Sequence, residues 1–260
     1  MSDVVELAIE NGVAHIRFRR PERLNALDLA MTTAFRARVT EAVTDPQVRV
    51  VVLSGDGRAF MAGGDLAWLK ASSDRQRSVR DLISPIHEAL IMLDRSGLPV
   101  LAAVQGAVAG AGMSLALFAD LVIAADDARF NMAYLKVGAP PDCGGSLSLT
   151  RLVGLRKAME IALLCEPLDA AKALEIGLVN RIVPNLDLEA AVMAWADRIA
   201  AGPPLATRST RSLIASTTGR NLADHLAAEL ERFVACAGTA DFEEALDAFL
   251  TKRPPVFAGR

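Results

Sequence analysis

The sequence predicts an α/β fold, in which a strand-rich first part is followed by a run of helices. Two observations carry this prediction. Near-continuous apolar runs at 49–54, 99–104 and 121–125 are typical of strands that are covered on both faces. After Phe130 the apolar residues recur at helical spacing instead, in one segment after another. An α/β core with helices gathered at its end accounts for both patterns.

The first part begins with a predicted hairpin and continues with alternating helices and strands. Segments 4–9 and 13–18 alternate apolar and polar residues around Asn11-Gly12, a pair that favours a tight turn. Asp28 precedes a helical pattern over 29–43, as an N-cap residue does. A second helical pattern covers 76–93, and Gly97-Leu98-Pro99 marks its end.

The second part is predicted to be helical almost throughout. Its helices cover 147–153, 156–164, 170–176, 188–200, 205–215, 223–236 and 241–250. Terminal helices rich in Ala and Leu often cover a neighbouring subunit, so we expect a core at 1–195 and a helical oligomerisation region at 196–260. The tail 253–260 contains two prolines and is expected to be a loosely held extension.

The composition suits one large domain, or one domain with a small appendage, with apolar surface left over for subunit contacts. The chain has 260 residues, 52% of them hydrophobic, and a mean hydropathy of +0.30. A net charge of −3 without a basic stripe argues against a nucleic-acid partner. No apolar run reaches the ~18 residues that a membrane span needs, and no targeting segment is visible. Three scattered cysteines without a CxxC pair predict a reducing, cytoplasmic location and no metal framework.

The densest basic cluster comes directly after the predicted hairpin. It consists of Arg17, Arg19, Arg20 and Arg23, and Glu22 interrupts it. Two interpretations remain open for these four arginines: a solvated strand end, or a contact for an anionic ligand.

The segment 55–66 is a glycine-rich turn that follows a predicted buried strand. Small residues at 62–64 let a ligand approach the main chain, and Asp65 can cap a short helix that runs to Lys70. The N–H group of Gly64 would then be free at a helix start, where anionic oxygens bind. Such turns are common in α/β proteins, so a purely structural role is the alternative.

A second turn of this kind, 105–116, follows the next predicted buried strand. It combines three glycines with small residues at the start of a helix, whose free N–H groups suit an anionic oxygen. Close helix–sheet packing is the alternative reason for such small side chains. Two turns of this kind could place one main-chain N–H on either side of a carbonyl oxygen. Donors preorganised in this way contribute ~3 kcal/mol each to an enolate or tetrahedral oxyanion.

Asp142 is a carboxylate in an unusual setting, between Pro140-Pro141 and Cys143-Gly144-Gly145. The prolines stiffen the approach and the glycines open the exit. The acid is therefore either the N-cap of the helix that follows or a positioned general base. The three histidines lie outside the glycine-rich loops, so ordinary core or surface roles are expected for His15, His87 and His225.

Ordered motifs along nearly the whole chain resemble the crotonase (enoyl-CoA hydratase/isomerase) superfamily. The resemblance rests on five stretches, 20–27, 60–66, 105–112, 141–154 and 173–180. It implies a crotonase-like ββα-repeat spiral core with a C-terminal helical trimerisation region, and a homotrimer or hexamer. It also implies an acyl-CoA thioester as the partner and no separate cofactor, since coenzyme A enters as part of the substrate.

The resemblance assigns roles residue by residue. The N–H groups of Gly64 and Ala111 would hold the thioester carbonyl. Residues that would line the coenzyme A, the pantetheine and the thioester are, in chain order, Arg23, Ala26, Leu27, Ala62, Asp65 and Leu66. Tyr134 either borders the acyl pocket or belongs to the ordinary core.

The chain departs from the hydratase pattern at both carboxylates that activate water. Hydratases of the superfamily carry glutamates at the positions held here by Ser114 and Tyr134. Neither residue replaces a carboxylate at neutral pH, which leaves Asp142 as the acid. The Asp142 loop most resembles the phenylacetate-pathway ring-epoxide/enoyl-CoA isomerases, so a double-bond isomerase is expected. Hydration, dehalogenation or thioester hydrolysis, and a catalytically silent CoA-ester binding protein, are the alternatives.

Overall fold

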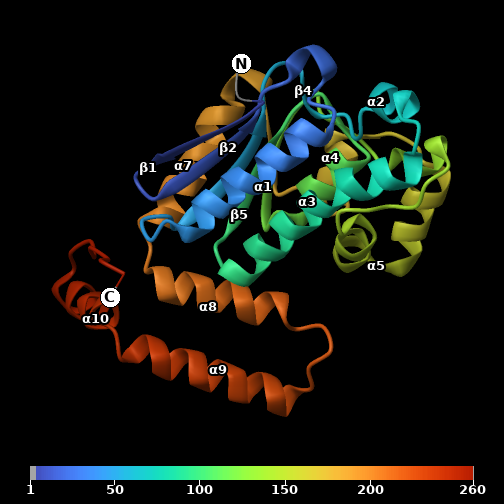
Figure 1. Cartoon of the computed structure of the whole chain (residues 1–260). Helices are drawn as coiled ribbons and strands as arrows, with labels where there is room; N and C mark the ends of the chain where they lie inside the picture. The colour runs from blue at the N-terminus through green and yellow to red at the C-terminus, as the bar shows by residue number, and fades with distance from the viewer. Residues whose placement is uncertain (1–3, 260) are drawn as a thin grey trace.

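Two β-sheets form the centre of the computed structural model, which describes residues 4–259 (Figure 1). The larger sheet has six strands in the order β1-β2-β3-β5-β7-β10. Only the β1–β2 pair is antiparallel, as the predicted hairpin requires. The bounds are β1 Val5–Glu10, β2 Val13–Phe18, β3 Val50–Gly55, β5 Val100–Val104, β7 Leu121–Ala125 and β10 Arg181–Val183.

The central strands of this sheet are buried on both faces, as their apolar runs predict. Successive residues of a strand point to opposite faces. Val51 and Leu53 of β3 therefore join the core under α1 (Leu29–Thr44) and α3 (Arg75–Ser96). Val50 and Val52 join a second core under α7 (Leu188–Ala200). Helices thus cover both faces, which explains why the alternation of apolar and polar residues is absent from these strands.

A second sheet of short strands was not predicted. It has the order β4-β6-β8-β9, with bounds β4 Ala59–Met61, β6 Ala107–Ala109, β8 Arg129–Asn131 and β9 Leu168–Asp169. Strands of two or three residues are too short to show a period. Each of β4, β6 and β8 follows a long strand of the first sheet and precedes a helix. This arrangement is the expected ββα repeat, and the predicted α/β core is confirmed.

The remaining helices of the core follow the predicted segments closely. They are α2 Leu66–Ala71, α4 Ala111–Phe118, α5 Gly145–Leu164 and α6 Ala170–Glu175, with 3-10 turns at Pro21–Arg23, Ala133–Val137 and Asn185–Asp187. The two helices predicted over 147–164 form one element that is kinked at Gly154, with φ 75° and ψ 163°. Glycine accepts this backbone conformation without a steric penalty.

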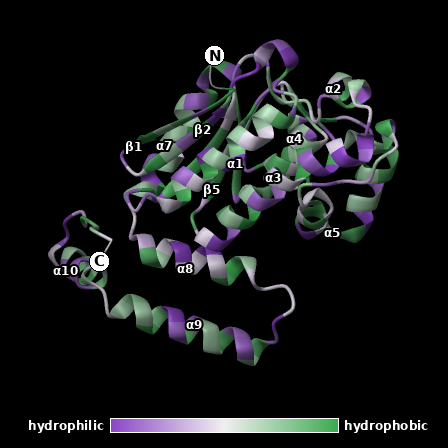
Figure 2. Ribbon diagram, in the orientation of Figure 1, coloured by the Kyte–Doolittle hydropathy of each residue, from purple (hydrophilic) through white to green (hydrophobic). Residues whose placement is uncertain are grey.

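The last three helices stand away from the sheets as an arm (Figure 1). They are α8 Pro204–Ala215, α9 Leu222–Ala237 and α10 Ala240–Thr251. No residue of α9 is buried, although the helix contains hydrophobic as well as hydrophilic residues (Figure 2). A helical C-terminal region is confirmed. The division at residue 195 stays a prediction, and α7 runs across it.

The tail is held in place, so the expectation of a loose extension was wrong. The carboxylate of Asp241 accepts hydrogen bonds from the main-chain N–H groups of residues 258 and 259, the shortest at 2.7 Å. Arg253 pairs with Glu244 at 2.6 Å and lowers the pKa of that carboxyl to about 2. Arg49 donates to the carbonyls of both Ala200 and Phe257, at 2.9 and 3.2 Å. The end of the chain is thereby tied to the end of α7.

No helix within residues 4–259 is both long enough and apolar enough to cross a bilayer.

Candidate active site

The first glycine-rich loop connects β4 to α2. Asp65 caps α2 as predicted, because its Oδ1 accepts two N–H groups of the first turn at 3.1 Å. Leu27 lies alongside, donating to the Gly63 carbonyl and accepting from the Asp65 N–H, each at 2.8 Å. The Gly64 N–H donates to no acceptor within residues 4–259. This main-chain donor is therefore open to a ligand.

The second loop connects β6 to α4 and meets the first. Gly110 has φ 52° and ψ −124°, a conformation that favours glycine, and Ala111 begins the helix. Its N–H, like that of Gly64, donates to no acceptor in the described chain. A Cβ on Gly110 would lie 3.6 Å from the Cα of Gly63. The two turns are neighbours in space, as expected; that they hold an oxygen stays a prediction.

Asp142 faces Tyr134 and does not cap α5. The Tyr134 hydroxyl donates a short hydrogen bond to Oδ1 of Asp142. Gly144 occupies the N-cap position of α5, with φ 72°, and no side chain bonds to the first turn. Asp142 reaches α5 only through its main-chain carbonyl, which accepts the N–H of Gly145 at 2.8 Å. The alternative interpretation of Asp142 as a side-chain N-cap is therefore wrong.

Ser114 and Tyr134, at the two positions where hydratases carry glutamates, form a hydrogen bond with each other. Ser114 Oγ lies 2.9 Å from Tyr134 Oη, and both residues are buried. Burial and the neighbouring Asp142 raise the pKa of Tyr134 well above its usual range, so the phenol stays a neutral donor. Ser114 lies on α4, three residues after Ala111. The pair thus connects Asp142 to α4, the helix that begins at the free N–H of Ala111.

A contact across the fold also holds the backbone after Asp142. Cys143 has φ 50°, which is uncommon for a residue other than glycine, and its N–H donates to Nε2 of His87 on α3 at 3.2 Å. The sequence indicates no special role for His87, so this anchor was missed. Burial and the charge of Asp142 raise the pKa of the Cys143 thiol. The thiol stays neutral and is not an activated nucleophile.

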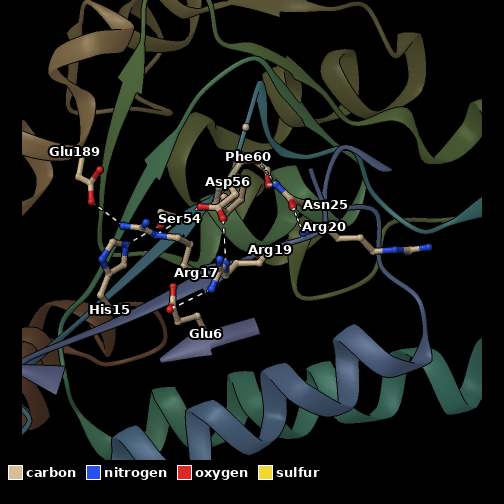
Figure 3. A network of polar contacts seen from close by, with 12 residues as sticks. Glu6, His15, Arg17, Arg19, Arg20, Asn25, Ser54, Asp56, Phe60 and Glu189 are labelled. Atoms are coloured by element: carbon tan, nitrogen blue, oxygen red, sulfur yellow. Dashed lines mark hydrogen bonds and ion pairs between the residues drawn. The ribbon is translucent and has the colours of Figure 1, made fainter. Parts of the chain in front are cut away.

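Three of the four clustered arginines form ion pairs, and two of these three do so at the end of β2 (Figure 3). Arg17 pairs with Glu189 of α7 at 2.6 Å, and Arg19 pairs with Asp56 at 3.2 Å. Asp56 follows β3, so these contacts tie the end of β2 to its neighbours. For this part of the cluster the interpretation as a structural strand end holds.

The other two arginines lie nearer the glycine-rich loops. Arg20 donates to Oδ2 of Asp65 at 2.9 Å, and its own N–H donates to Oδ1 of buried Asn25 at 2.8 Å. Asn25, with φ 54°, also donates to the carbonyl oxygens of Asp56, just after β3, and of Ala59, the first residue of β4 (Figure 3). Arg23 is exposed and forms no ion pair within residues 4–259. Arg20, a member of the basic cluster, and Asn25, for which the sequence indicated no role of its own, shape the turn that presents Arg23.

The residues expected to line the coenzyme A and pantetheine lie on adjoining segments. The Ala62 N–H donates to the Leu24 carbonyl at 3.0 Å, and Leu27 bridges to Gly64. The turn at 23–27 therefore runs beside the loop at 62–66. Leu66 is exposed at the start of α2, where an apolar side chain is open to a ligand. Binding by these segments stays a prediction.

Comparison with known proteins agrees with this architecture. The family model described as enoyl-CoA hydratase/isomerase matches residues 8–260. A Rhodobacter capsulatus protein named "Probable enoyl-CoA hydratase" is 39% identical over 98% of both chains. The 1,2-epoxyphenylacetyl-CoA isomerase of Escherichia coli is 34% identical over 100% of both. A crystal structure of an enoyl-CoA hydratase from Bacillus anthracis superposes with a TM-score of 0.93 at 30% identity, covering 99% of this chain and 100% of that one.

The chain therefore belongs to the enoyl-CoA hydratase/isomerase family. The expected crotonase superfamily is confirmed. Relatives with hydratase names and relatives with isomerase names occur side by side, so the branch has to be argued from the residues of this site.

Proposed function

We propose that the protein is an acyl-CoA isomerase that shifts a double bond, or rearranges a ring epoxide, through a thioester dienolate. One observation carries the proposal. Asp142 accepts a hydrogen bond from Tyr134, and Ser114 and Tyr134, in the two hydratase positions, are hydrogen-bonded to each other where a pair of carboxylates would stand. A double-bond shift needs one base, whereas hydration needs a carboxylate arrangement that positions water.

The reaction needs only groups that this chain supplies. Asp142 takes the proton from the α carbon, and the electrons of the broken C–H bond pass into a dienolate. The N–H groups of Gly64 and Ala111 stabilise the negative oxygen, contributing ~3 kcal/mol each. Asp142 then returns the same proton to the γ carbon, and the double bond moves into conjugation with the thioester. No net proton is gained or lost.

The binding surface follows from the exposed and half-buried residues around the two loops. Exposed Arg23 would face the phosphates of coenzyme A, beside half-buried Ala26, whereas the buried Leu27 side chain would leave only its main chain near the ligand. Ala62 and Leu66 would line the pantetheine. The Asp65 side chain is committed to Arg20 and to α2, so it would contribute by holding the loop in shape. Tyr134 would border the acyl group from its place beside Asp142.

Hydration is the competing function, and the name of the Rhodobacter capsulatus relative favours it. The two reactions differ in what they ask of Asp142. An isomerase requires only that it exchange a proton with the acyl chain, whereas a hydratase must also activate and place a water molecule.

The test uses 3-enoyl-CoA and follows the absorbance of the conjugated 2-enoyl thioester. Wild type should form the product, and Asp142→Asn should slow it roughly 10²- to 10⁴-fold, as loss of an acid/base group does. Asp126→Asn, in an exposed turn after β7, removes the same charge elsewhere and should have no effect. Crotonyl-CoA hydration is measured alongside. Faster hydration than isomerisation would reject the proposal, and thioester binding without either reaction would identify a silent binding protein.

We also propose that the arm joins copies of this chain into a homotrimer or hexamer. The apolar residues of α9 are more than half exposed: Leu222, Leu226, Leu230, Phe233 and Val234. Apolar surface of this extent on one helix is typical of an interface. Sedimentation should give three or six times the 27.6 kDa chain mass, and Leu230→Glu with Phe233→Glu should shift it toward one. A monomeric wild type would overturn this proposal.

A further inference from the structure

The hydrogen bonds around Tyr134 have a fixed direction. A carboxylate only accepts hydrogen bonds, so the single proton of the Tyr134 hydroxyl goes to Oδ1 of Asp142. The Tyr134 oxygen must then accept from Ser114 Oγ, 2.9 Å away. The hydroxyl protons of Ser114 and Tyr134 therefore both point toward Asp142, the first through the Tyr134 oxygen.

The surrounding packing leaves the side chains of Ser114 and Tyr134 little room to move. Ser114 is fully buried, and Tyr134 is 8% exposed. A Cβ on Gly145 would lie only 2.1 Å from Ser114 Oγ, so the first turn of α5 presses directly on the hydroxyl. Burial and Asp142 also raise the pKa of Tyr134, which keeps its proton in place at neutral and moderately alkaline pH. The phenol is a permanent donor to one oxygen of the acid.

From this arrangement we infer that Tyr134 is a positioning residue that makes the two oxygens of Asp142 unequal. Oδ1 is occupied by the phenol, so Oδ2 takes the α proton and gives it to the γ carbon. The inference rests on the proposed isomerase function and adds its proton path. Tyr134 keeps its own proton throughout: a C–H bond breaks at the α carbon as the O–H bond forms on Oδ2, and the reverse occurs at the γ carbon.

The consequence is that the proton stays inside the site. A carboxyl group held at Oδ1 cannot rotate, so the acquired proton remains directed at the acyl chain. Without the phenol, the protonated group can turn and exchange its proton with water before the second transfer. Tyr134 would thus set the balance between internal transfer and exchange with solvent.

The test follows deuterium from the α carbon. Substrate 3-enoyl-CoA with two deuterium atoms at the α carbon is converted in ordinary water, and the label at the γ carbon of the product is measured by mass spectrometry. Wild type should retain part of the label. Tyr134→Phe keeps the ring but should lose most of this retention, and should lower kcat about 10- to 100-fold with KM unchanged, as expected for a lost hydrogen bond to a charged group.

Ser114→Ala is the companion variant, because it leaves the Tyr134–Asp142 bond in place. Label retention should then stay close to wild type, with a smaller fall in kcat. Equal retention in wild type and Tyr134→Phe, or complete loss of label already in wild type, would overturn the inference. Neither result would affect the proposed function, which fails only if wild type does not isomerise or if Asp142→Asn is as fast as wild type.

A second measurement is independent of turnover. Tyr134 is the only tyrosine of the chain, so phenolate absorbance during alkaline titration reports on it alone. Wild type should form no phenolate until the fold melts, whereas Asp142→Asn, without the neighbouring negative charge, should ionise at lower pH. Ordinary ionisation near pH ~10 in folded wild type would contradict the hydrogen-bond arrangement.

Discussion

The two halves of the candidate site are built from different materials. The donor half, formed by the loops around Gly64 and Ala111, is held by main-chain hydrogen bonds and by backbone segments in close contact. The acid half, around Asp142, is held by side chains that reach it from α3, from α4 and from the 3-10 turn before the loop. Asp65 and Arg20 help to hold the first loop in shape, but the donors themselves are main-chain groups that no side-chain substitution removes. A substitution in the acid half, in contrast, replaces the group that would carry the proton.

Among substitutions that leave Asp142 itself unchanged, the largest effect is expected from adding a methyl group to the donor half. A Cβ on Gly112 would lie 2.2 Å from the Met61 carbonyl oxygen, which belongs to the backbone and cannot rotate away. Gly112→Ala should therefore move α4 and its first donor. We expect kcat to fall about 100-fold, as for one lost oxyanion donor, and the free energy of unfolding to fall by about 2 kcal/mol. Enzyme kinetics and urea unfolding measure the two effects.

The same substitution in the acid half should cost less. Gly145→Ala places its Cβ against Ser114 Oγ, a side-chain atom that can be removed. We expect kcat to fall several-fold, because the clash disturbs Ser114 and, through it, Tyr134. The double variant Gly145→Ala with Ser114→Ala should recover to the level of Ser114→Ala alone. If the kcat of the double variant does not recover, the acid half is as rigid as the donor half, and the proposed difference between the two halves is wrong.

A smaller effect is expected at His87, the anchor of the Cys143 N–H. His87→Ala removes a hydrogen bond to the loop, which is worth about 1 kcal/mol, or roughly a fivefold decrease in kcat. His87→Gln offers an amide oxygen in place of the ring nitrogen and should restore part of the rate. A steady-state assay of both variants at fixed pH checks this. Equal rates for the two would mean that the main-chain anchor does not position Asp142.

The smallest effect on catalysis is expected from replacing His15, whose side chain hydrogen-bonds to Ser54 and to no residue of either half of the site. Its Nε2 lies 2.6 Å from Ser54 Oγ (Figure 3), and burial, followed by Arg17, lowers the pKa of His15. The unfolded chain therefore binds this proton more readily. The contribution of neutral His15 to stability is complete above the unfolded pKa of ~6.5 and is lost as the pH falls below it.

In His15→Gln, the free energy of unfolding should accordingly fall less between pH 7 and pH 5 than it does in wild type. The kcat of the variant at neutral pH should be unchanged. Urea unfolding at several pH values measures the first effect. A pH dependence identical to wild type would show that His15 does not titrate differently in the folded state. A large loss of kcat would show that the site extends across the sheet.

The donor half could be predicted from sequence because its signals are local. Glycines follow a buried strand and precede a helix start, so Gly64 and Asp65 were located from the sequence pattern, and the choice of Ala111 in the second loop came from the family resemblance. The helices of the arm were found from their helical spacing, and the break between the two helices predicted over 147–164 is a kink at Gly154 within one element. The short strands of the second sheet were not, because three residues carry no periodicity.

The acid half could be predicted only in part, because its contacts join distant residues. Asp142 is conspicuous between prolines and glycines, but Ser114 lies 20 residues before Tyr134, and His87 lies 56 residues before Cys143. Sequence spacing gives no reason to join them. The tail was misjudged for a related reason, since its hydrogen bonds to Asp241 and Glu244 depend on how the chain turns after α10.

The buried thiol of Cys143 makes the acid loop observable by chemical labelling. Because the thiol is neutral and enclosed, an alkylating reagent reaches it only while the loop has left its seat between α3 and α5. The half-buried Cys236 on α9 supplies an internal reference in the same molecule. The ratio of the two modification rates therefore reports how often Asp142, the proposed catalytic acid, leaves its place, and a bound thioester that stabilises the loop should lower that ratio.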